Sequence, residues 1–290
     1  MRWEGNRESD NVEDARGTGG GGGGFHLGGG SLSIGSIVIA VIAGWIFGIN
    51  PLQILGLMSG GGAPTAEQVP AGKPPADDPA ARFVSVVLGD TEDVWRAKFK
   101  QNGQAYREPK LRLFRGSTAT ACGQGQAAMG PFYCPTDERV YIDLSFYDTL
   151  RSRLGAPGDF AQAYVIAHEV AHHVQKLMGV HDRVESMRGR LSEAQNNALS
   201  VRVELQADCL AGVWAHDAQA ARQILEQGDV EEALRAASQI GDDTLQRRSR
   251  GTIVPESFTH GTSAQRVGWF KRGLQTGSVA QCDTFAARDL

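Results

Sequence analysis

The stretch DFAQAYVIAHEVAHHVQ, residues 159–175, has the pattern of a capped, amphipathic helix. Asp159 is suited to cap its start, with Gln162 three residues later as in a capping box, and Gly179 is suited to end it. Apolar side chains recur at helical spacing along the stretch, namely Tyr164, Ala167, Ala171, Val174 and Met178. We therefore predict one helix from Asp159 to about Met178.

On this helix His168 and His172 lie one turn apart on the same face. Two imidazoles so placed can bind one tetrahedral cation, and Glu169 between them can reach a water molecule beside the metal. The pattern predicts a zinc site with Glu169 as general base, and a helix with solvated His and Glu side chains is the alternative. The side chain of His173 points about 100° away from His172 and is interpreted as a bystander.

A zinc site of this type needs a third protein ligand. The metzincin extension of the motif requires Gly three residues and His six residues after His172. Gln175 and Met178 occupy those positions, so that class is excluded. A Glu from a later helix is the alternative, and His181 and His216 are weaker candidates.

A second predicted helix opens with the capping box Ser192-Glu-Ala-Gln195 and continues through SVRVELQADCLAGVWAHD, residues 200–217. Glu204 and Asp208 are four residues apart on one face of it, and this face also carries Ala198, Val201, Leu205 and Gly212. Acidic side chains on an inward face need partners. We expect Glu204 to bind the metal and Asp208 to accept a hydrogen bond from a ligand histidine, which fixes its tautomer. An ordinary solvated acidic pair is the alternative.

Further motifs lie on both sides of these helices. They are Met1-Arg-Trp, Asn11-Val-Glu-Asp-Ala-Arg-Gly17, Ala121-Cys122-Gly123, Gly130-Pro-Phe-Tyr-Cys134-Pro135 and Thr259-His260-Gly-Thr-Ser-Ala-Gln-Arg266. With His168–His173 and Glu204–Cys209, they make the chain resemble the neutral zinc metallopeptidase family of bacterial membrane proteins, nearly from end to end.

The resemblance implies a gluzincin-like fold in which His168, His172 and Glu204 hold one zinc ion. In other gluzincins a late His or Arg hydrogen-bonds the oxyanion, so His260 is a candidate for that role and Arg266 is a second candidate. A structural cap or a core hydrogen bond is the alternative role for His260.

The N-terminal third differs in composition from the rest. Residues 1–30 are polar and then glycine-rich, and we expect them to be disordered and to bury no core. Ile34 to about Leu57 supplies the roughly 20 apolar residues that span a bilayer. About 30 residues, five of them acidic, precede this run, which argues against a cleaved signal peptide. We predict a transmembrane helix over residues 31–57, a Pro/Gly/Ala linker over 58–80 and a globular domain over 81–290.

Positive charge predicts the orientation of this helix. Arg2, Arg7 and Arg16 precede it, whereas only Lys73 follows within twenty residues. The positive-inside rule places the N-terminus in the cytoplasm and the domain in the periplasm or outside the cell. Disulfides persist in such compartments. The four cysteines favour the local pairs Cys122–Cys134 and Cys209–Cys282, although three connectivities are possible.

The globular part begins with a helical pattern and continues with short β-like runs over 111–114 and 140–146, after which helical patterns dominate. This order predicts an α+β fold, a zincin-like domain with a small sheet followed by helices. By fold analogy, Thr118–Cys122 is expected to be the edge strand that pairs with an extended peptide.

We therefore predict a membrane-anchored metalloendopeptidase with one zinc ion per chain that acts on peptide or protein substrates. A composition of 41% hydrophobic residues and a net charge of −4 exclude a disordered protein and a general nucleic-acid-binding protein. A catalytically idle, zinc-stabilised binding module is one alternative, which Glu169 disfavours because a structural zinc site needs no general base. A zinc amidase that acts on cell-wall linkages is another.

Overall fold

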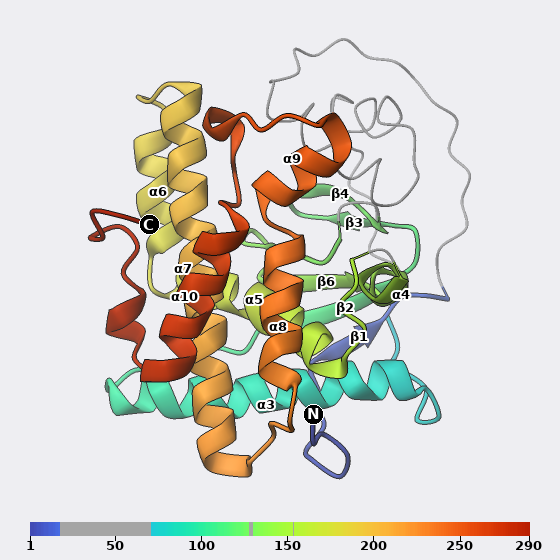
Figure 1. Ribbon diagram of the computed structural model, residues 1–290. Coiled ribbons are helices and arrows are strands. Elements are labelled where there is room, and N and C mark those ends of the chain that lie inside the picture. Colours follow the sequence, from blue (N-terminus) through green and yellow to red (C-terminus); the bar gives the residue numbers. More distant parts are fainter. Residues whose placement is uncertain (18–70, 128–129, 153) are drawn as a thin grey trace.

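The computed structural model describes residues 1–17, 71–127, 130–152 and 154–290, and its strands precede most of its helices (Figure 1). The main sheet has the order β1-β2-β6-β5, in which β1, β2 and β6 are parallel and β5 is antiparallel to β6. Its strands are β1 (Val12–Asp14), β2 (Lys110–Phe114), β5 (Phe132–Cys134) and β6 (Arg139–Asp143). A separate antiparallel hairpin consists of β3 (Ser117–Thr120) and β4 (Gly123–Gln126).

The helices surround this sheet and pack on one another. They are α3 (Pro79–Gln101), α4 (Ser145–Ser152), α5 (Asp159–Leu177), α6 (Val180–Arg188), α7 (Glu193–Arg222), α8 (Asp229–Gln239), α9 (Asp242–Arg250) and α10 (Ser263–Thr276), with the 3-10 turns η2 (Pro255–Ser257) and η3 (Val279–Cys282). Figure 1 shows α3 crossing beneath the sheet, and α5 lies in the centre between the sheet and the later helices. The predicted α+β fold, a small sheet followed mostly by helices, is confirmed.

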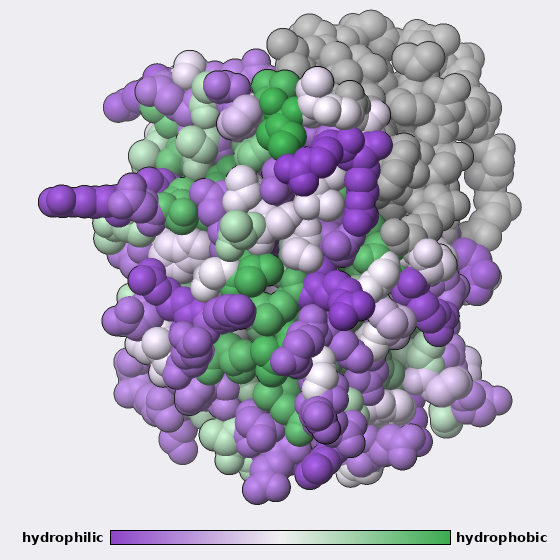
Figure 2. All heavy atoms as spheres, in the orientation of Figure 1, coloured by the Kyte–Doolittle hydropathy of each residue, from purple (hydrophilic) through white to green (hydrophobic). Residues whose placement is uncertain are grey.

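The central helix α5 is buried on most sides. The apolar side chains of α5 between Phe160 and Val174 have almost no exposed surface. The ring of Phe160 stacks on Trp214 of α7 at a centroid distance of 5.9 Å. The face drawn in Figure 2 is mostly hydrophilic, with a hydrophobic strip along α8 and beside α10. Burial of α5 between sheet and helices places its side chains at the centre of the domain.

The helix ends agree with the sequence patterns to within one residue. The residue before α5 is Gly158, which makes no side-chain cap, and Asp159 is the first helical residue rather than the cap. Gly179 has a left-handed φ of 76°, as expected for the residue that ends a helix. The capping box of Ser192 and Gln195 is present at the start of α7.

Close contact between α7 and α10 depends on glycine. A Cβ atom on Gly273 would lie 1.9 Å from the carbonyl oxygen of Cys209, so no larger residue fits there. The predicted disulfide Cys209–Cys282 ties α7 to η3, and Cys122–Cys134 ties the turn of the β3–β4 hairpin to the end of β5. Both predicted pairings are therefore confirmed.

Residues 1–17 do not match the expectation of a disordered segment that buries no core. Met1, Val12 and Ala15 are buried, and β1 pairs with β2 inside the main sheet. The last part of the predicted linker is also ordered, since Gly72 bridges to Asp14 and α3 already begins at Pro79. The strand was missed because the composition was judged over residues 1–30 as a whole, in which a glycine run follows residues 1–17.

The predicted transmembrane helix, residues 31–57, lies outside the described residues, as do residues 18–30 and 58–70. Within the part of the chain that the structure describes, no helix has both the length and the apolar character needed to cross a membrane.

Candidate metal centre

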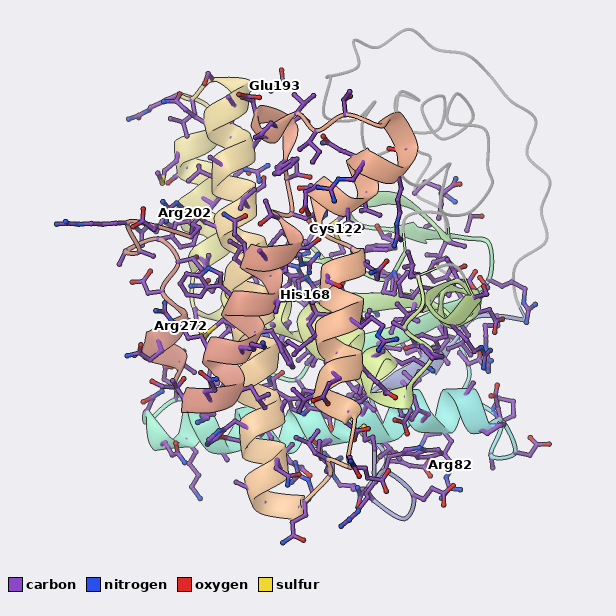
Figure 3. The ribbon with its side chains drawn as sticks, in the orientation of Figure 1. Arg82, Cys122, His168, Glu193, Arg202 and Arg272 are labelled. Carbon is purple, nitrogen blue, oxygen red and sulfur yellow. A yellow bond between two sulfur atoms is a disulfide. The ribbon has the colours of Figure 1, made fainter. Side chains whose placement is uncertain are left out.

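Two neighbouring helices bring three potential metal ligands together. His168 and His172 of α5 face Glu204 of α7, and one ligand atom from each lies within 4.8 Å of the other two. In detail, Nε2 of His168 is 3.1 Å from Oε2 of Glu204, and Nε2 of His172 is 3.6 Å from Oε1. Figure 3 shows His168 near the centre of the molecule, between α10 and α8 in this view. The structure thus brings together the three residues that the sequence analysis names as candidate ligands.

These donors suit zinc. Two imidazole nitrogens and one carboxylate are a common ligand set of catalytic zinc sites, which keep a further coordination position open. The three side chains line a cleft of about 600 Å³. A cation between them is therefore within reach of a substrate.

The charges at the site also favour a cation. Burial lowers the pKa of His168, but Asp208 and Glu204 outweigh this effect and raise it to about 10 in the metal-free protein. Burial alone raises the pKa of Glu204, yet the neighbouring His172 and His168 hold it well below its usual value. The Glu204 carboxylate is thus negatively charged and compensated by positive charge at the position that a metal ion would take.

His168 is oriented by a buried network on its Nδ1 side. Nδ1 lies 2.9 Å from Oδ1 of Asp208, and because a carboxylate only accepts, the imidazole donates there and presents Nε2 to Glu204. Arg266 donates to both oxygens of Asp208 at 2.9 Å, and the hydroxyl of Tyr164 donates to Oδ1 at 2.5 Å. Asp208 thus makes the contact that the sequence predicts for it.

His172 is oriented by Gln175, the residue that occupies the glycine position of the metzincin motif. The amide nitrogen of Gln175 donates to the carbonyl oxygen of Val203 and to Gln206, so its Oε1 faces Nδ1 of His172 at 2.8 Å. Gln175 is completely buried. The sequence feature that could have indicated this contact is the position of Gln175, three residues after His172 on the same helix.

Glu169 lies beside the trio and lines the same cleft. It is buried, and burial raises the pKa of its carboxyl, although His172 and His168 partly oppose this effect. A carboxylate with a raised pKa, placed next to a metal site and facing a cleft, has the properties of a general base.

His260 also lines the cleft, on the loop before α10. One oxygen of Asp242 accepts hydrogen bonds from the backbone amides of Thr259, His260 and Gly261 at 2.7, 2.6 and 3.0 Å. The side chain of His260 is partly exposed, and desolvation in the cleft lowers its pKa, but Asp242 and Glu204 outweigh this effect and raise the pKa. Asp242 was missed in the sequence because its link to this loop is purely tertiary.

The other candidates have different roles. Arg266 is 2% exposed and its guanidinium is held by Asp208, so it positions that residue rather than offering a free donor. His181 lines the cleft but lies outside the ligand trio, and its Nε2 is 3.1 Å from the carbonyl oxygen of His172. His216 is 2.8 Å from the carbonyl oxygen of Leu274, between α7 and α10. His173 is not part of the ligand trio, but it joins α5 to β5. Its Nδ1 accepts a hydrogen bond from the hydroxyl of Tyr133, and its Nε2 donates to the carbonyl oxygen of Arg107.

The strand beside the cleft is β5, not the predicted segment Thr118–Cys122. Residues 117–120 form β3 and pair with β4 in the separate hairpin. β5 is an edge strand of the main sheet, and Phe132 and Tyr133 from it line the cleft together with Gly130 and Pro131. The sequence misplaced this strand because β5 has only three residues and lies between turn residues.

Sequence comparisons agree with this site. Residues 1–285 match the family described as "Putative neutral zinc metallopeptidase". The chain belongs to this family. It is 53% identical over 290 residues to the uncharacterized protein YpfJ of Escherichia coli K12, covering 98% of this chain and 99% of that protein. It is also 43% identical over 222 residues to the uncharacterized protein Mb2605 of Mycobacterium bovis, covering 73% and 74% of the two chains. No solved structure matches significantly.

Proposed function

We propose that this member of the family is an active metallopeptidase that binds one zinc ion per chain through His168, His172 and Glu204 and hydrolyses peptide bonds. The observation that carries the proposal is the buried carboxylate of Glu169 beside a trio of ligand atoms within 4.8 Å of one another, all facing one cleft. A purely structural zinc site needs neither this carboxylate nor this cleft.

Zinc held by these residues supplies Lewis acidity and lowers the pKa of water to roughly 7. Glu169 accepts the proton of the attacking water and passes it to the leaving amine. Its burial supports this role, because a raised pKa brings a carboxyl closer to neutral pH. His260 donates to the oxyanion, and the amides that Asp242 holds fix the position of its loop.

The shape of the cleft suits an extended peptide. The outer edge of β5 pairs with no other strand among the described residues, and it offers backbone groups for strand pairing with a substrate. Apolar side chains of Phe146, Leu154, Val165 and Leu245 line the cleft as well, and they provide room for an apolar substrate side chain. A zinc amidase acting on cell-wall linkages would use the same catalytic residues, and it is the second function to test.

We further propose that the enzyme works in an oxidising compartment, the periplasm or the cell exterior, and is membrane-associated through its apolar segment at residues 31–57. Two disulfides that use all four cysteines support the compartment. The absence of charged residues between Arg16 and Glu67 supports the membrane association.

The decisive experiment compares wild type with Glu169→Gln and with Glu185→Gln, which changes an exposed carboxylate at the rim of the same cleft. The purified full-length chain is loaded with zinc and assayed on a casein-type substrate, a peptide panel and murein fragments. We expect peptide hydrolysis by wild type and by Glu185→Gln, with a loss of roughly 10²–10⁴ in rate for Glu169→Gln at unchanged zinc content. Hydrolysis of murein fragments alone favours the amidase. Tight zinc binding without hydrolysis of any substrate favours the idle module.

A further inference from the structure

Residues 1–17 are an integral part of the folded domain. In Figure 1 this blue segment passes α3 and continues as β1 beside β2. The strand pairing places Val12 opposite Leu111, and backbone hydrogen bonds join the segment to β2. The backbone amide of Leu111 donates to the carbonyl oxygen of Asn11 at 2.9 Å, and the amide of Ala15 donates to the carbonyl oxygen of Leu113 at 2.8 Å.

A buried carboxylate of α3 depends on this segment. Glu92 has a side chain that is 1% exposed, and its oxygens accept hydrogen bonds from Arg7, Ser9 and Asn11 at 2.8, 2.5 and 2.8 Å. Removing these donors would leave a charged group buried without its partners, which is strongly destabilising. The packing is also close, because a Cβ atom on Gly89 would lie 2.9 Å from the carbonyl oxygen of Arg7.

The two ends of the stretch between residues 17 and 71 meet at the same place. Asp14 and Gly72 exchange two backbone hydrogen bonds of 2.7 and 3.1 Å. Next to them, Arg16 forms an ion pair of 2.6 Å with Asp78. These contacts require that residues 14–16 and residues 72–78 share one aqueous compartment.

From these contacts we infer that residues 1–17 and residues 71–290 lie on the same side of the membrane. A hydrocarbon core is about 30 Å thick, so a chain that crosses it once cannot keep hydrogen bonds between its two flanks. Two crossings need roughly 40 apolar residues, whereas one apolar run of about half that length lies between Arg16 and Glu67.

The orientation predicted from positive charge, with a cytoplasmic N-terminus and the domain outside, is therefore incompatible with this fold. The positive-inside rule assumes a single crossing, and the tertiary contacts of residues 1–17 remove that assumption.

Single-cysteine labelling tests this inference without using enzyme activity. Asp10 and Lys73 form an exposed ion pair of 2.9 Å, with side chains that are 90% and 81% exposed. All four native cysteines are in disulfides, so an introduced thiol has no background. Full-length Asp10→Cys and Lys73→Cys are labelled with a membrane-impermeant maleimide in intact cells and after permeabilisation. Gln101→Cys, at the far end of α3, reports on the domain.

We expect the three thiols to behave alike in intact cells, either all labelled or all protected, and all to be labelled after permeabilisation. Protection of Asp10→Cys while Lys73→Cys and Gln101→Cys are labelled would overturn the inference, and so would the reverse pattern. If all three are labelled in intact cells, the proposed compartment is also supported. If all three are protected, the same-side inference stands and the proposed compartment is wrong.

A cross-link tests the contact itself. A hydrogen-bonded antiparallel pair has Cα atoms about 5.5 Å apart, which suits a disulfide, and a Cβ atom on Gly72 meets nothing within 4 Å. We expect full-length Asp14→Cys/Gly72→Cys, oxidised in native membranes, to give a cross-linked peptide by mass spectrometry. The control Asp14→Cys/Gln101→Cys should not cross-link, because Gln101 ends α3, a helix roughly 33 Å long, whereas Arg16 beside Asp14 pairs with Asp78 at the opposite end of that helix. Absence of the 14–72 cross-link would contradict the inference.

Discussion

Nδ1 of His172 donates a hydrogen bond to Oε1 of Gln175 at 2.8 Å. Both residues lie on α5, but the orientation of the Gln175 amide is decided by Val203 and Gln206 of α7. The other histidine is oriented by Asp208, also from α7. Each candidate histidine ligand is thus aligned by contacts from the helix that carries Glu204, so the packing of α5 on α7 determines the geometry of the whole site.

Gln175→Leu should weaken zinc binding roughly 10–100-fold, because loss of a partner that orients a ligand histidine has this effect in other zinc sites. Gln162→Leu makes the same chemical change on a partly exposed position of α5 and serves as the matched control. Zinc affinity is measured by competition with a chelator. Equal affinities for the two variants would show that Gln175 does not orient His172.

Glu204→Ala should lose most of its zinc, since a site with only two protein ligands binds zinc weakly. Glu193→Ala, at the exposed start of the same helix, should retain one zinc ion per chain. Metal content of the purified full-length proteins decides the outcome. Full occupancy in Glu204→Ala would point to His181, the other histidine at the cleft, as the third ligand.

Arg266→Met should destabilise the fold by about 3–5 kcal/mol, because it leaves the buried carboxylate of Asp208 without its cation. Lys271→Met, on the exposed side of the same helix, should change the free energy of unfolding by less than about 0.5 kcal/mol. Urea unfolding of both zinc-loaded variants measures the difference. A small effect of Arg266→Met would mean that Asp208 is compensated by other groups.

The contribution of His260 to stability should depend on pH. Desolvation in the cleft lowers the pKa of this partly exposed histidine, but Asp242 and Glu204 raise the folded pKa above the usual value near 6.5. The stabilisation is therefore fully present below about pH 6.5 and is lost as the pH rises through the raised pKa. Melting temperatures of metal-free wild type and His260→Gln should differ most at low pH and converge at high pH. Nδ1 of His260 lies 3.4 Å from Oδ1 of Asp242, and a difference that is independent of pH would contradict an ion pair between them.

The sequence by itself determined the features that depend on local spacing. Helical periodicity and the four-residue spacing of His168 and His172 determine one face of α5, and the same spacing places Glu204 and Asp208 on one face of α7. Cys122 and Cys134, which are only 12 residues apart, pair with each other. These patterns repeat within one or two turns of a helix or between nearby residues, so they are readable without knowledge of the fold.

Only the tertiary structure decided which distant segments meet. Asp242 holds the loop of His260 through backbone amides that have no sequence signature, and Gln175 acts on His172 only because α7 orients its amide. Residues 1–17 were expected to be disordered, yet β1 completes the sheet and its flanks meet residues 72–78. A three-residue strand has too few side chains to show a period, and its stability comes from β2 and α3, which lie far along the chain.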